Sequence, residues 1–293
     1  MNDALTQVER EFIEFMSEKR KKPLPEIRDL YLATREEFRF GTAGYRELVD
    51  TIHRLCRLRY DDADQREVID SYRFHELIHL FRFLSYAALT PKASFASSLG
   101  LAVRLVLRGN YEDVGKALLQ KLKKSRENGE ENGAGNGGYA ATAARLLELV
   151  DGKPAVVDYG CGVGYLSYEL AKLRRETQIY LVDIDSLILE FARFRFRKLA
   201  VPVKVIRITK ENLYPDLPAH SICIATEVLE HVFDPLKAFT KIRKRLLRGG
   251  IWYGDFADRR QEMFHISADL QAVRAESQRY FQRVSEGIYR KVA

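Results

Sequence analysis

The chain has 293 residues and a formal net charge of +7, with 46% hydrophobic and 30% charged residues, which predicts a globular protein of two domains. No apolar run approaches the roughly 18 residues of a membrane-spanning helix, and the N-terminus lacks the basic-then-apolar order of a signal peptide, so we expect a cytoplasmic protein. Three widely spaced cysteines, Cys56, Cys161 and Cys223, argue against a disulfide framework or a cysteine metal site.

Helical periodicity dominates residues 1–127, which we interpret as an all-α N-terminal domain. Thr34 with Glu37 forms a capping box that predicts a helix start, and Thr90 followed by proline predicts another. Residues 128–138 contain several glycines and no large apolar residue, so we expect a flexible linker there.

The helical half contains a literal H-E-x-x-H pattern, His75-Glu76-Leu77-Ile78-His79. On a helix this pattern can hold zinc through both histidines, with the glutamate as a base. A third ligand is not evident, because the next acidic residues, Glu112 and Asp113, stand at a predicted helix start about thirty positions later. We therefore favour histidines that line an interdomain face or a substrate pocket, and a zinc hydrolase is the alternative.

Residues 139–293 alternate short apolar runs with helical stretches, which predicts an α/β domain with a parallel sheet. A helix over residues 139–150 leads into a first strand that ends at the turn Asp158-Tyr159-Gly160-Cys161-Gly162-Val163-Gly164. Alternate glycines allow positive φ and close approach of a ligand to the main chain. The spacing differs from the dinucleotide fingerprint G-x-G-x-x-G, and Asp158 would repel a diphosphate, so we expect a cationic ligand.

The remaining elements of this half alternate along the chain. We expect helices over residues 165–172, 187–199, 235–247 and 267–279, and strands at residues 179–185, 203–208, 221–225, 251–252, 280–285 and 288–292. In the second of these helices Phe191 and Phe194 should face the sheet, while Arg193, Arg195 and Arg197 extend into solvent. This interpretation makes the basic and aromatic alternation a poor indicator of a nucleic-acid surface.

Four ordered segments carry a family resemblance. They are the D-x-G-x-G-x-G turn, the second strand ending in Asp183, the segment Glu227-Val228-Leu229-Glu230-His231 after the fourth strand, and Gly249-Gly250 before the fifth. This order resembles the class I S-adenosylmethionine (SAM)-dependent methyltransferases. The resemblance implies a seven-stranded, Rossmann-like sheet over residues 139–293 that binds SAM at the turn.

The resemblance also implies roles for individual residues. Asp183 would hold the two ribose hydroxyls, and Cys161 would be a small residue packed under the turn. The residues themselves leave three roles open for Tyr139 and Tyr159, which are a hydrogen bond to the methionine carboxylate, closure of the pocket and ordinary aromatic packing. Adenine would meet backbone groups of Thr209 or Lys210, or side chains of Glu211 or Asn212. The predicted cofactor-binding residues are Tyr139, Asp158, Gly160, Cys161, Gly162, Gly164, Asp183, Ile184, Thr209, Lys210 and Glu227.

Two histidines are the candidate catalytic residues, His231 and His265. The resemblance implies that His231 is a general base or orients the acceptor, and a neutral imidazole suits proton removal near pH 7. In some relatives, residues similar to Glu227, Glu230 and His231 hold a divalent cation with a later histidine, here His265. We do not favour a metal, because E-V-L-E-H segments also occur in relatives that use none.

We therefore expect a methyltransferase that methylates an oxygen or nitrogen of a small molecule, with the helical domain as a lid or recognition surface. Residues 139–293 carry 25 basic and 19 acidic residues, which permits an anionic substrate. A nucleic-acid methyltransferase and a non-catalytic SAM-binding protein are the alternatives. No membrane partner is expected, and the sequence does not determine the oligomeric state.

Overall fold

A computed structural model describes residues 5–37, 136–254 and 270–293 of the chain. These residues belong to two compact units, one containing the N-terminal helices and the other containing residues 137–293. The boundaries predicted for the helical domain and for the linker stay predictions.

The described N-terminal residues form two helices, α1 (Gln7–Arg20) and α2 (Leu24–Glu37). A capping box starts α1, since the Thr6 side chain accepts from the Glu9 backbone and the Glu9 side chain accepts from the Thr6 backbone. Phe12 of α1 meets Tyr31 of α2 edge to face at 6.1 Å, and the Tyr31 hydroxyl donates to buried Glu9 at 2.8 Å. These contacts hold the two helices together.

The capping box predicted at Thr34 and Glu37 is wrong. Both residues lie inside α2, which begins ten residues earlier, so Thr34 continues a helix and does not start one. The first turn of a helix can be recognised only if its preceding residues are not helical. The predicted helix start at Thr90 and the H-E-x-x-H pattern at His75–His79 lie outside the described residues.

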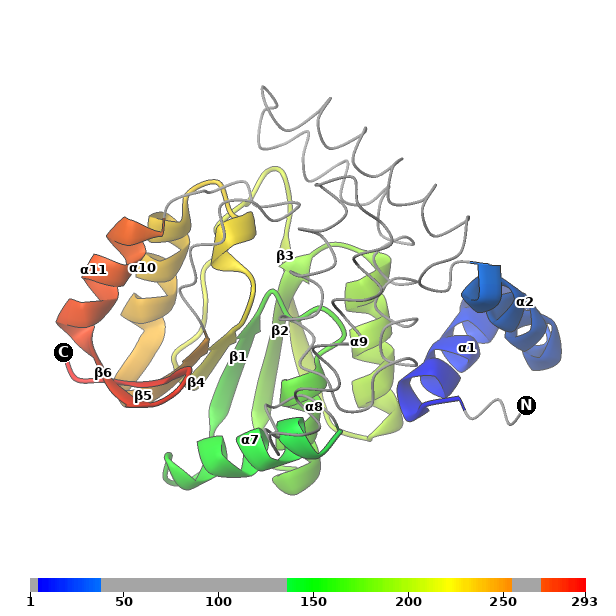
Figure 1. The fold of residues 1–293 in the computed structure, drawn as a ribbon, viewed down its shortest axis with the longest axis horizontal. Helices are drawn as coiled ribbons and strands as arrows, with labels where there is room; N and C mark the ends of the chain where they lie inside the picture. The colour runs from blue at the N-terminus through cyan, green and yellow to red at the C-terminus, as the bar shows by residue number, and fades with distance from the viewer. Residues whose placement is uncertain (1–4, 38–135, 255–269) are drawn as a thin grey trace, which may run out of the picture. The chain divides into compact units, whose positions relative to one another are not determined.

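The second unit contains a seven-stranded sheet in the order β3-β2-β1-β4-β5-β7-β6. Figure 1 labels these strands except β7. The strands are β1 (Ala155–Tyr159), β2 (Gln178–Ile184), β3 (Val203–Ile208), β4 (His220–Ala225), β5 (Leu246–Gly254), β6 (Phe281–Ser285) and β7 (Ile288–Lys291). Strands β1 to β5 pair in parallel, whereas β7 pairs antiparallel with both β5 and β6. The predicted α/β fold with a seven-stranded, Rossmann-like sheet is confirmed.

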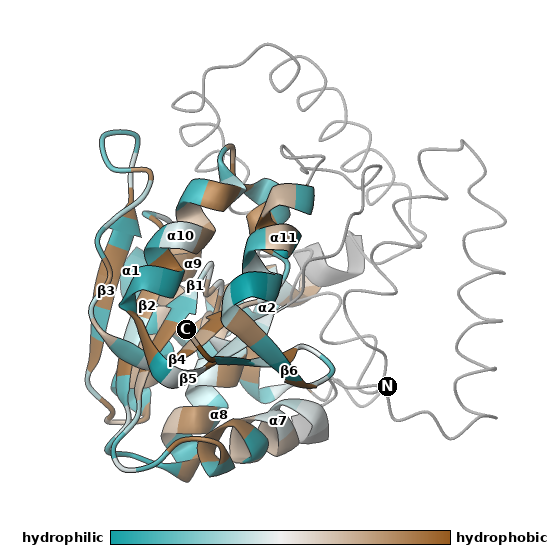
Figure 2. Ribbon diagram, turned by 90° about the vertical axis from the view of Figure 1, so that its left-hand side faces the viewer, coloured by the Kyte–Doolittle hydropathy of each residue, from teal (hydrophilic) through white to brown (hydrophobic). Residues whose placement is uncertain are grey.

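Helices cover both faces of this sheet. They are α7 (Asn136–Glu148), α8 (Tyr165–Leu173), α9 (Leu187–Lys198), the short 3-10 helix η1 (Leu229–His231), α10 (Pro235–Arg245) and α11 (Gln271–Tyr280). Alternate residues of each strand enter two cores, one shared with α7, α8 and α9 and the other with α10 and α11. Figure 2 shows hydrophobic residues along the strands and hydrophilic residues on the outer sides of α10 and α11.

Several element boundaries differ from the sequence prediction. Helix α7 begins at Asn136, inside the predicted linker, and α10 ends at Arg245, two residues earlier than expected. The early end of α10 follows from long-range pairing. Leu246 pairs with His220 of β4 and is 1% exposed, so strand pairing and burial outweigh helix continuation there.

The order of the strands positions a ligand site. Strand β1 lies between β2 and β4, and the chain passes to one side of β1 for β2 and β3 and to the other side for β4 and β5. Open α/β sheets bind ligands outside the carboxyl ends of their strands where the order reverses. The residues after β1, β2 and β4 therefore lie at the edge where a ligand would bind. Among the described helices none is long and apolar enough to span a membrane.

Candidate cofactor site

The turn after β1 is held in shape by its own backbone and by β2. The N–H groups of Gly160 and Cys161 donate to the Val182 carbonyl at 2.7 and 3.2 Å, and Gly164 donates to the Cys161 carbonyl at 2.7 Å. Gly160, Gly162 and Gly164 all have left-handed φ values, 69°, 52° and 68°. A side chain in these conformations costs roughly 1 kcal/mol or more, which explains the alternating glycines.

The three glycines differ in what surrounds them. A Cβ on Gly160 would lie 2.4 Å from a methyl group of Val228, and one on Gly164 would lie 3.1 Å from the Phe196 ring. A Cβ on Gly162 would meet nothing within 4 Å. Gly160 therefore permits the loop after β4 to pack on the turn, whereas Gly162 faces open space that a ligand can enter.

Asp183 at the end of β2 binds the same turn. Its two carboxylate oxygens accept from the N–H groups of Gly162 and Ile184, each at 2.7 Å. Burial raises the pKa of Asp183, and these two hydrogen bonds act in the opposite direction. The carboxylate thus lies beside the open side of the turn.

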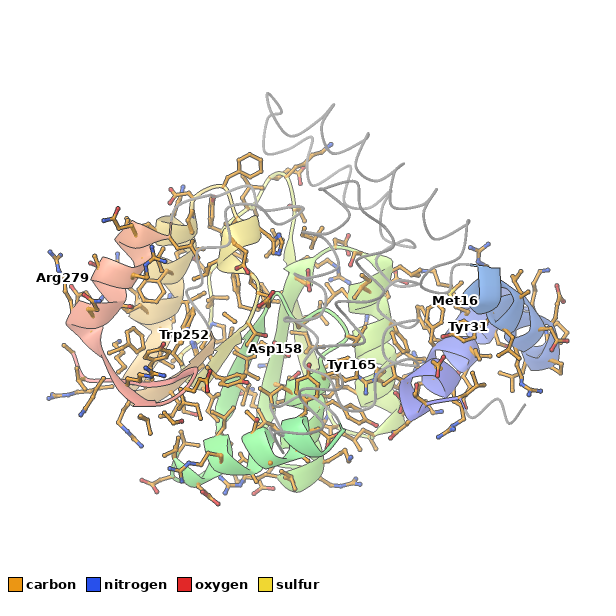
Figure 3. The ribbon with its side chains drawn as sticks, viewed as in Figure 1. Met16, Tyr31, Asp158, Tyr165, Trp252 and Arg279 are labelled. Atoms are coloured by element: carbon orange, nitrogen blue, oxygen red, sulfur yellow. The ribbon has the colours of Figure 1, made fainter. Side chains whose placement is uncertain are left out.

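Asp158 is the second carboxylate of the site, near the end of β1 (Figure 3). It is 4% exposed and accepts from the Ser167 hydroxyl of α8 at 2.5 Å. Burial raises the pKa of Asp158 to about 7; the Ser167 hydrogen bond lowers it and the nearby charge of Asp183 adds to the increase. Near neutral pH the folded protein therefore keeps a proton on this group that an exposed aspartate would have lost.

Cys161 is a buried residue of the turn. Its thiol is buried and hydrogen-bonds to Asp183, and burial together with the charges of Asp183 and Asp158 raises the thiol pKa well above its usual value. A protonated, buried thiol is a poor nucleophile.

Tyr139 of α7 contributes a phenol to the same edge of the sheet. Its ring stacks on Tyr165 with centroids 5.3 Å apart and planes 9° apart. Burial, together with the charges of Tyr253, Asp158 and Glu227, raises the pKa of Tyr139 to about 12. The structure thus brings Tyr139 near two of the other predicted site residues.

Glu227 follows β4 in an unusual backbone conformation. Its φ is 55°, the left-handed region that a residue with a Cβ seldom adopts. Such strain of order 1–3 kcal/mol is concentrated at binding and catalytic sites in proteins. Next to it, η1 contains buried Glu230 and half-buried His231, whose N–H donates to the Val228 carbonyl at 3.0 Å.

The predicted adenine residues form a tight loop after β3. Thr209 and Asn212 exchange backbone hydrogen bonds at 3.3 and 3.0 Å, and the Thr209 hydroxyl accepts from the Asn212 N–H at 3.2 Å. Lys210 lies between them. The adenine contacts of Thr209 and Lys210 stay a prediction.

A metal set is not assembled by the described residues alone. Among them, no group of three or more His, Cys, Asp or Glu side chains could hold a metal ion, so Glu227, Glu230 and His231 do not form one by themselves. His265, the fourth member of the alternative set and a candidate catalytic residue, lies outside the described residues.

Sequence reasoning missed three residues of the site and misread one of them. Ser167 contacts Asp158, and Val228 contacts Gly160. The third residue, Arg195, is 2% exposed, so the prediction that it extends into solvent is wrong. Arg195 follows the buried Phe191 by four residues and Ala192 by three, which puts all three on one helix face. That spacing was the available signal.

Comparison with known proteins agrees with this geometry. Residues 151–288 match the model of a family described as "Methyltransferase domain". The match covers a little under half of the chain and identifies a methyltransferase domain there. It agrees with the resemblance to the class I SAM-dependent methyltransferases.

Individual relatives cover less of the chain. A ubiquinone biosynthesis O-methyltransferase from Candida albicans is 31% identical over 104 residues, which are 35% of this chain and 32% of that protein. This chain thus spans about a third of that relative. Two solved structures are similar in part. A precorrin-6y C5,15-methyltransferase from Geobacter metallireducens has 21% identity and a TM-score of 0.32, covering 40% and 59% of the two chains. An rRNA methylase from Streptococcus thermophilus has 24% sequence identity and a TM-score of 0.38, and the match covers 52% of this chain and 95% of that chain.

Gly162 of the methyltransferase domain offers a test with a matched control. Gly162 and Gly152 both have positive φ, 52° and 67°, and at both positions a Cβ would meet nothing within 4 Å. We expect Gly162→Ala and Gly152→Ala each to lower the free energy of unfolding by roughly 1 kcal/mol, because the strain is alike. Only Gly162→Ala should weaken SAM binding, measured by isothermal titration calorimetry. Equal affinities for SAM would contradict a ligand at this turn.

The raised pKa of Asp158 should make the stability of the protein depend on pH. Because its pKa rises from 3.8 to about 7 on folding, the folded protein holds the proton more tightly, and the unfolding free energy of the wild type falls as pH rises through that range. Asp158→Asn removes this loss, so its unfolding free energy relative to wild type should rise by roughly 3 kcal/mol between pH 4 and pH 7. Denaturant unfolding at several pH values measures it.

The same substitution should weaken SAM binding above pH 7, where the wild-type carboxylate is charged and attracts a cation. For the wild type, affinity for SAM should increase as pH rises through about 7. A pH-independent affinity in wild type, matched by Asp158→Asn, would exclude a charge role for this group.

Proposed function

We propose that the protein is a SAM-dependent methyltransferase that methylates an oxygen or nitrogen of a small-molecule acceptor. The observation that supports this best is Asp183, because a carboxylate bonded to the glycine turn at Gly162 lies where a nucleoside would meet both. SAM supplies a methyl group already activated by its sulfonium charge. The protein's own contribution is then to bind, orient and exclude water.

Asp183 has the acceptor capacity that a ribose diol needs. A carboxylate offers about four acceptor positions, and the two backbone N–H groups use one on each oxygen. The Cys161 thiol, which also hydrogen-bonds to Asp183, is a weak donor that a hydroxyl can replace. Asp183 would therefore fix the nucleoside while it continues to hold the turn.

The charge of the site favours a cationic donor over a diphosphate. Asp158, Asp183 and Glu227 are the acidic groups that the sequence and the structure associate with this edge, and Asp158 and Glu227 both act on Tyr139. A diphosphate here would meet like charges in a partly dry environment. A sulfonium or an ammonium group would be attracted.

His231 is the candidate base within the described residues. His265, which lies outside them, is the other candidate. His231 follows the carboxyl end of β4 on η1, at the ligand-binding edge of the sheet. A hydroxyl acceptor must lose its proton as the methyl group transfers, and a neutral imidazole within hydrogen-bond reach can take it. An amine acceptor places less demand on a base.

A small-molecule acceptor is favoured by the Candida albicans relative, whose name specifies ubiquinone biosynthesis. A nucleic-acid acceptor would use the basic surplus of residues 139–293, but the inward position of Arg195 leaves Arg193 and Arg197 as the exposed arginines of α9. Binding of a nucleic acid would weaken steeply with salt, which distinguishes it. We also propose that the protein is cytoplasmic.

Asp183 and Asp185 give the decisive pair of variants. Asp183→Asn should lower SAM affinity by roughly tenfold to a hundredfold, because it removes charge-assisted hydrogen bonds to the ribose. Asp185→Asn should leave affinity within about threefold, since Asp185 is paired with Arg207 at 2.9 Å and is 37% exposed. Isothermal titration of SAM into the full chain measures both. Wild-type protein that binds no SAM would refute the proposal.

The acceptor is tested by incubating the protein with methyl-labelled SAM and separate pools of small molecules, RNA and protein. We expect label in the small-molecule pool, and loss of most of the transfer in Asp183→Asn. Label in RNA alone or protein alone would overturn the small-molecule assignment. SAM binding with no transfer to any pool would favour a non-catalytic SAM-binding protein.

A further inference from the structure

Arg195 is a buried cation in the middle of a charged helix surface. It lies on α9 at 2% exposure, whereas its neighbours Arg193 and Arg197 are exposed. Moving a guanidinium out of water is costly unless its new surroundings supply hydrogen bonds and favourable charge. The contacts of Arg195 therefore indicate what the burial achieves.

Two tyrosines of α8 receive the guanidinium. Its central carbon lies 4.3 Å from the ring centroid of Tyr168 and 5.2 Å from that of Tyr165. The Tyr168 ring is buried and the Tyr165 ring is half-buried. A cation near the faces of aromatic rings is attracted by their quadrupoles, and this attraction is strongest where water is absent. The planar guanidinium suits this environment better than the compact ammonium of lysine.

The polar end of Arg195 reaches the glycine turn itself. Its Nη1 donates to the Val163 carbonyl at 2.7 Å. Val163 stands between Gly162 and Gly164, both left-handed, and glycine-flanked peptides change conformation at little cost. A side-chain donor on this carbonyl removes that freedom.

The peptide group between Val163 and Gly164 is thereby held at both ends. Arg195 donates to the Val163 carbonyl of this peptide group. The Gly164 N–H of the same group donates to the Cys161 carbonyl at 2.7 Å. Because a peptide group is planar, its carbonyl and N–H must rotate together. Loss of the Arg195 bond therefore loosens the closing hydrogen bond of the turn as well.

The same guanidinium reaches the other side of the site through Tyr165. Tyr165, labelled in Figure 3, is the first residue of α8 and stacks on Tyr139, the phenol that lies near Asp158 and Glu227. Arg195 on α9 thus connects the turn with α8 and, through one ring stack, with α7.

We infer that Arg195 is a positioning residue of the cofactor site, which fixes the Val163 carbonyl and the Tyr165–Tyr139 stack so that the glycine turn is preformed for the nucleoside ligand. This inference rests on the proposed function for its ligand. A purely structural role for Arg195 in anchoring α9 would change stability and leave the turn and its affinity unaltered.

The test compares Arg195→Met and Arg195→Lys with the control Arg197→Met, which removes an exposed arginine two residues away that lies over the Phe194 ring. SAM affinity is measured by isothermal titration, and hydrogen–deuterium exchange follows peptides covering residues 160–166 without ligand. We expect Arg195→Met to weaken SAM binding at least roughly tenfold and to speed exchange of the Gly164 amide by a similar factor. Arg197→Met should change neither by more than about twofold.

Arg195→Lys should recover part of both losses, because an ammonium can still donate to the Val163 carbonyl but fills the place between the rings poorly. It also serves as the test if Arg195→Met does not fold. Wild-type affinity and wild-type exchange in Arg195→Lys and Arg195→Met, or lowered stability with unchanged exchange, would overturn the inference. If the wild type binds no SAM, the proposed function fails, while the exchange of residues 160–166 still decides whether Arg195 holds the turn.

Discussion

The site depends on hydrogen bonds between the turn after β1 and the end of β2. Val182 accepts from Gly160 and Cys161 through its backbone, and Asp183 accepts from Gly162 through its side chain. The parallel register of β1 and β2 brings these groups to one level of the sheet. A carboxylate that both shapes the turn and lies beside its open side couples the fold of the site to its binding capacity.

Two helices and one loop complete this arrangement from outside the turn. Ser167 of α8 bonds Asp158, Arg195 of α9 bonds the turn, and Val228 after β4 packs on Gly160. Each contact constrains a different peptide or side chain, so the turn is defined by tertiary packing as well as by its glycines. The left-handed Glu227 adjoins one of these contacts, which explains how its strain is maintained.

Local signals predicted the order of the elements and the strand ends that carry the site, because apolar alternation, caps and glycines act over a few residues. Long-range contacts explain the errors. The start of β5 depends on pairing of Leu246 with His220, and the inward direction of Arg195 depends on Tyr165 and Tyr168. The hydrogen bond from the Gly162 N–H to Asp183 likewise could not be predicted from the sequence, although both residues were predicted to bind the cofactor.

The proton held by Asp158 has a thermodynamic consequence. Its pKa of about 7 means that near neutrality a fraction of the molecules carry this proton. A positively charged ligand would favour the ionised form and expel the proton into the buffer. The apparent enthalpy of binding would then vary with the ionisation heat of the buffer, and the number of protons released per ligand would report how much of the carboxylate was neutral beforehand.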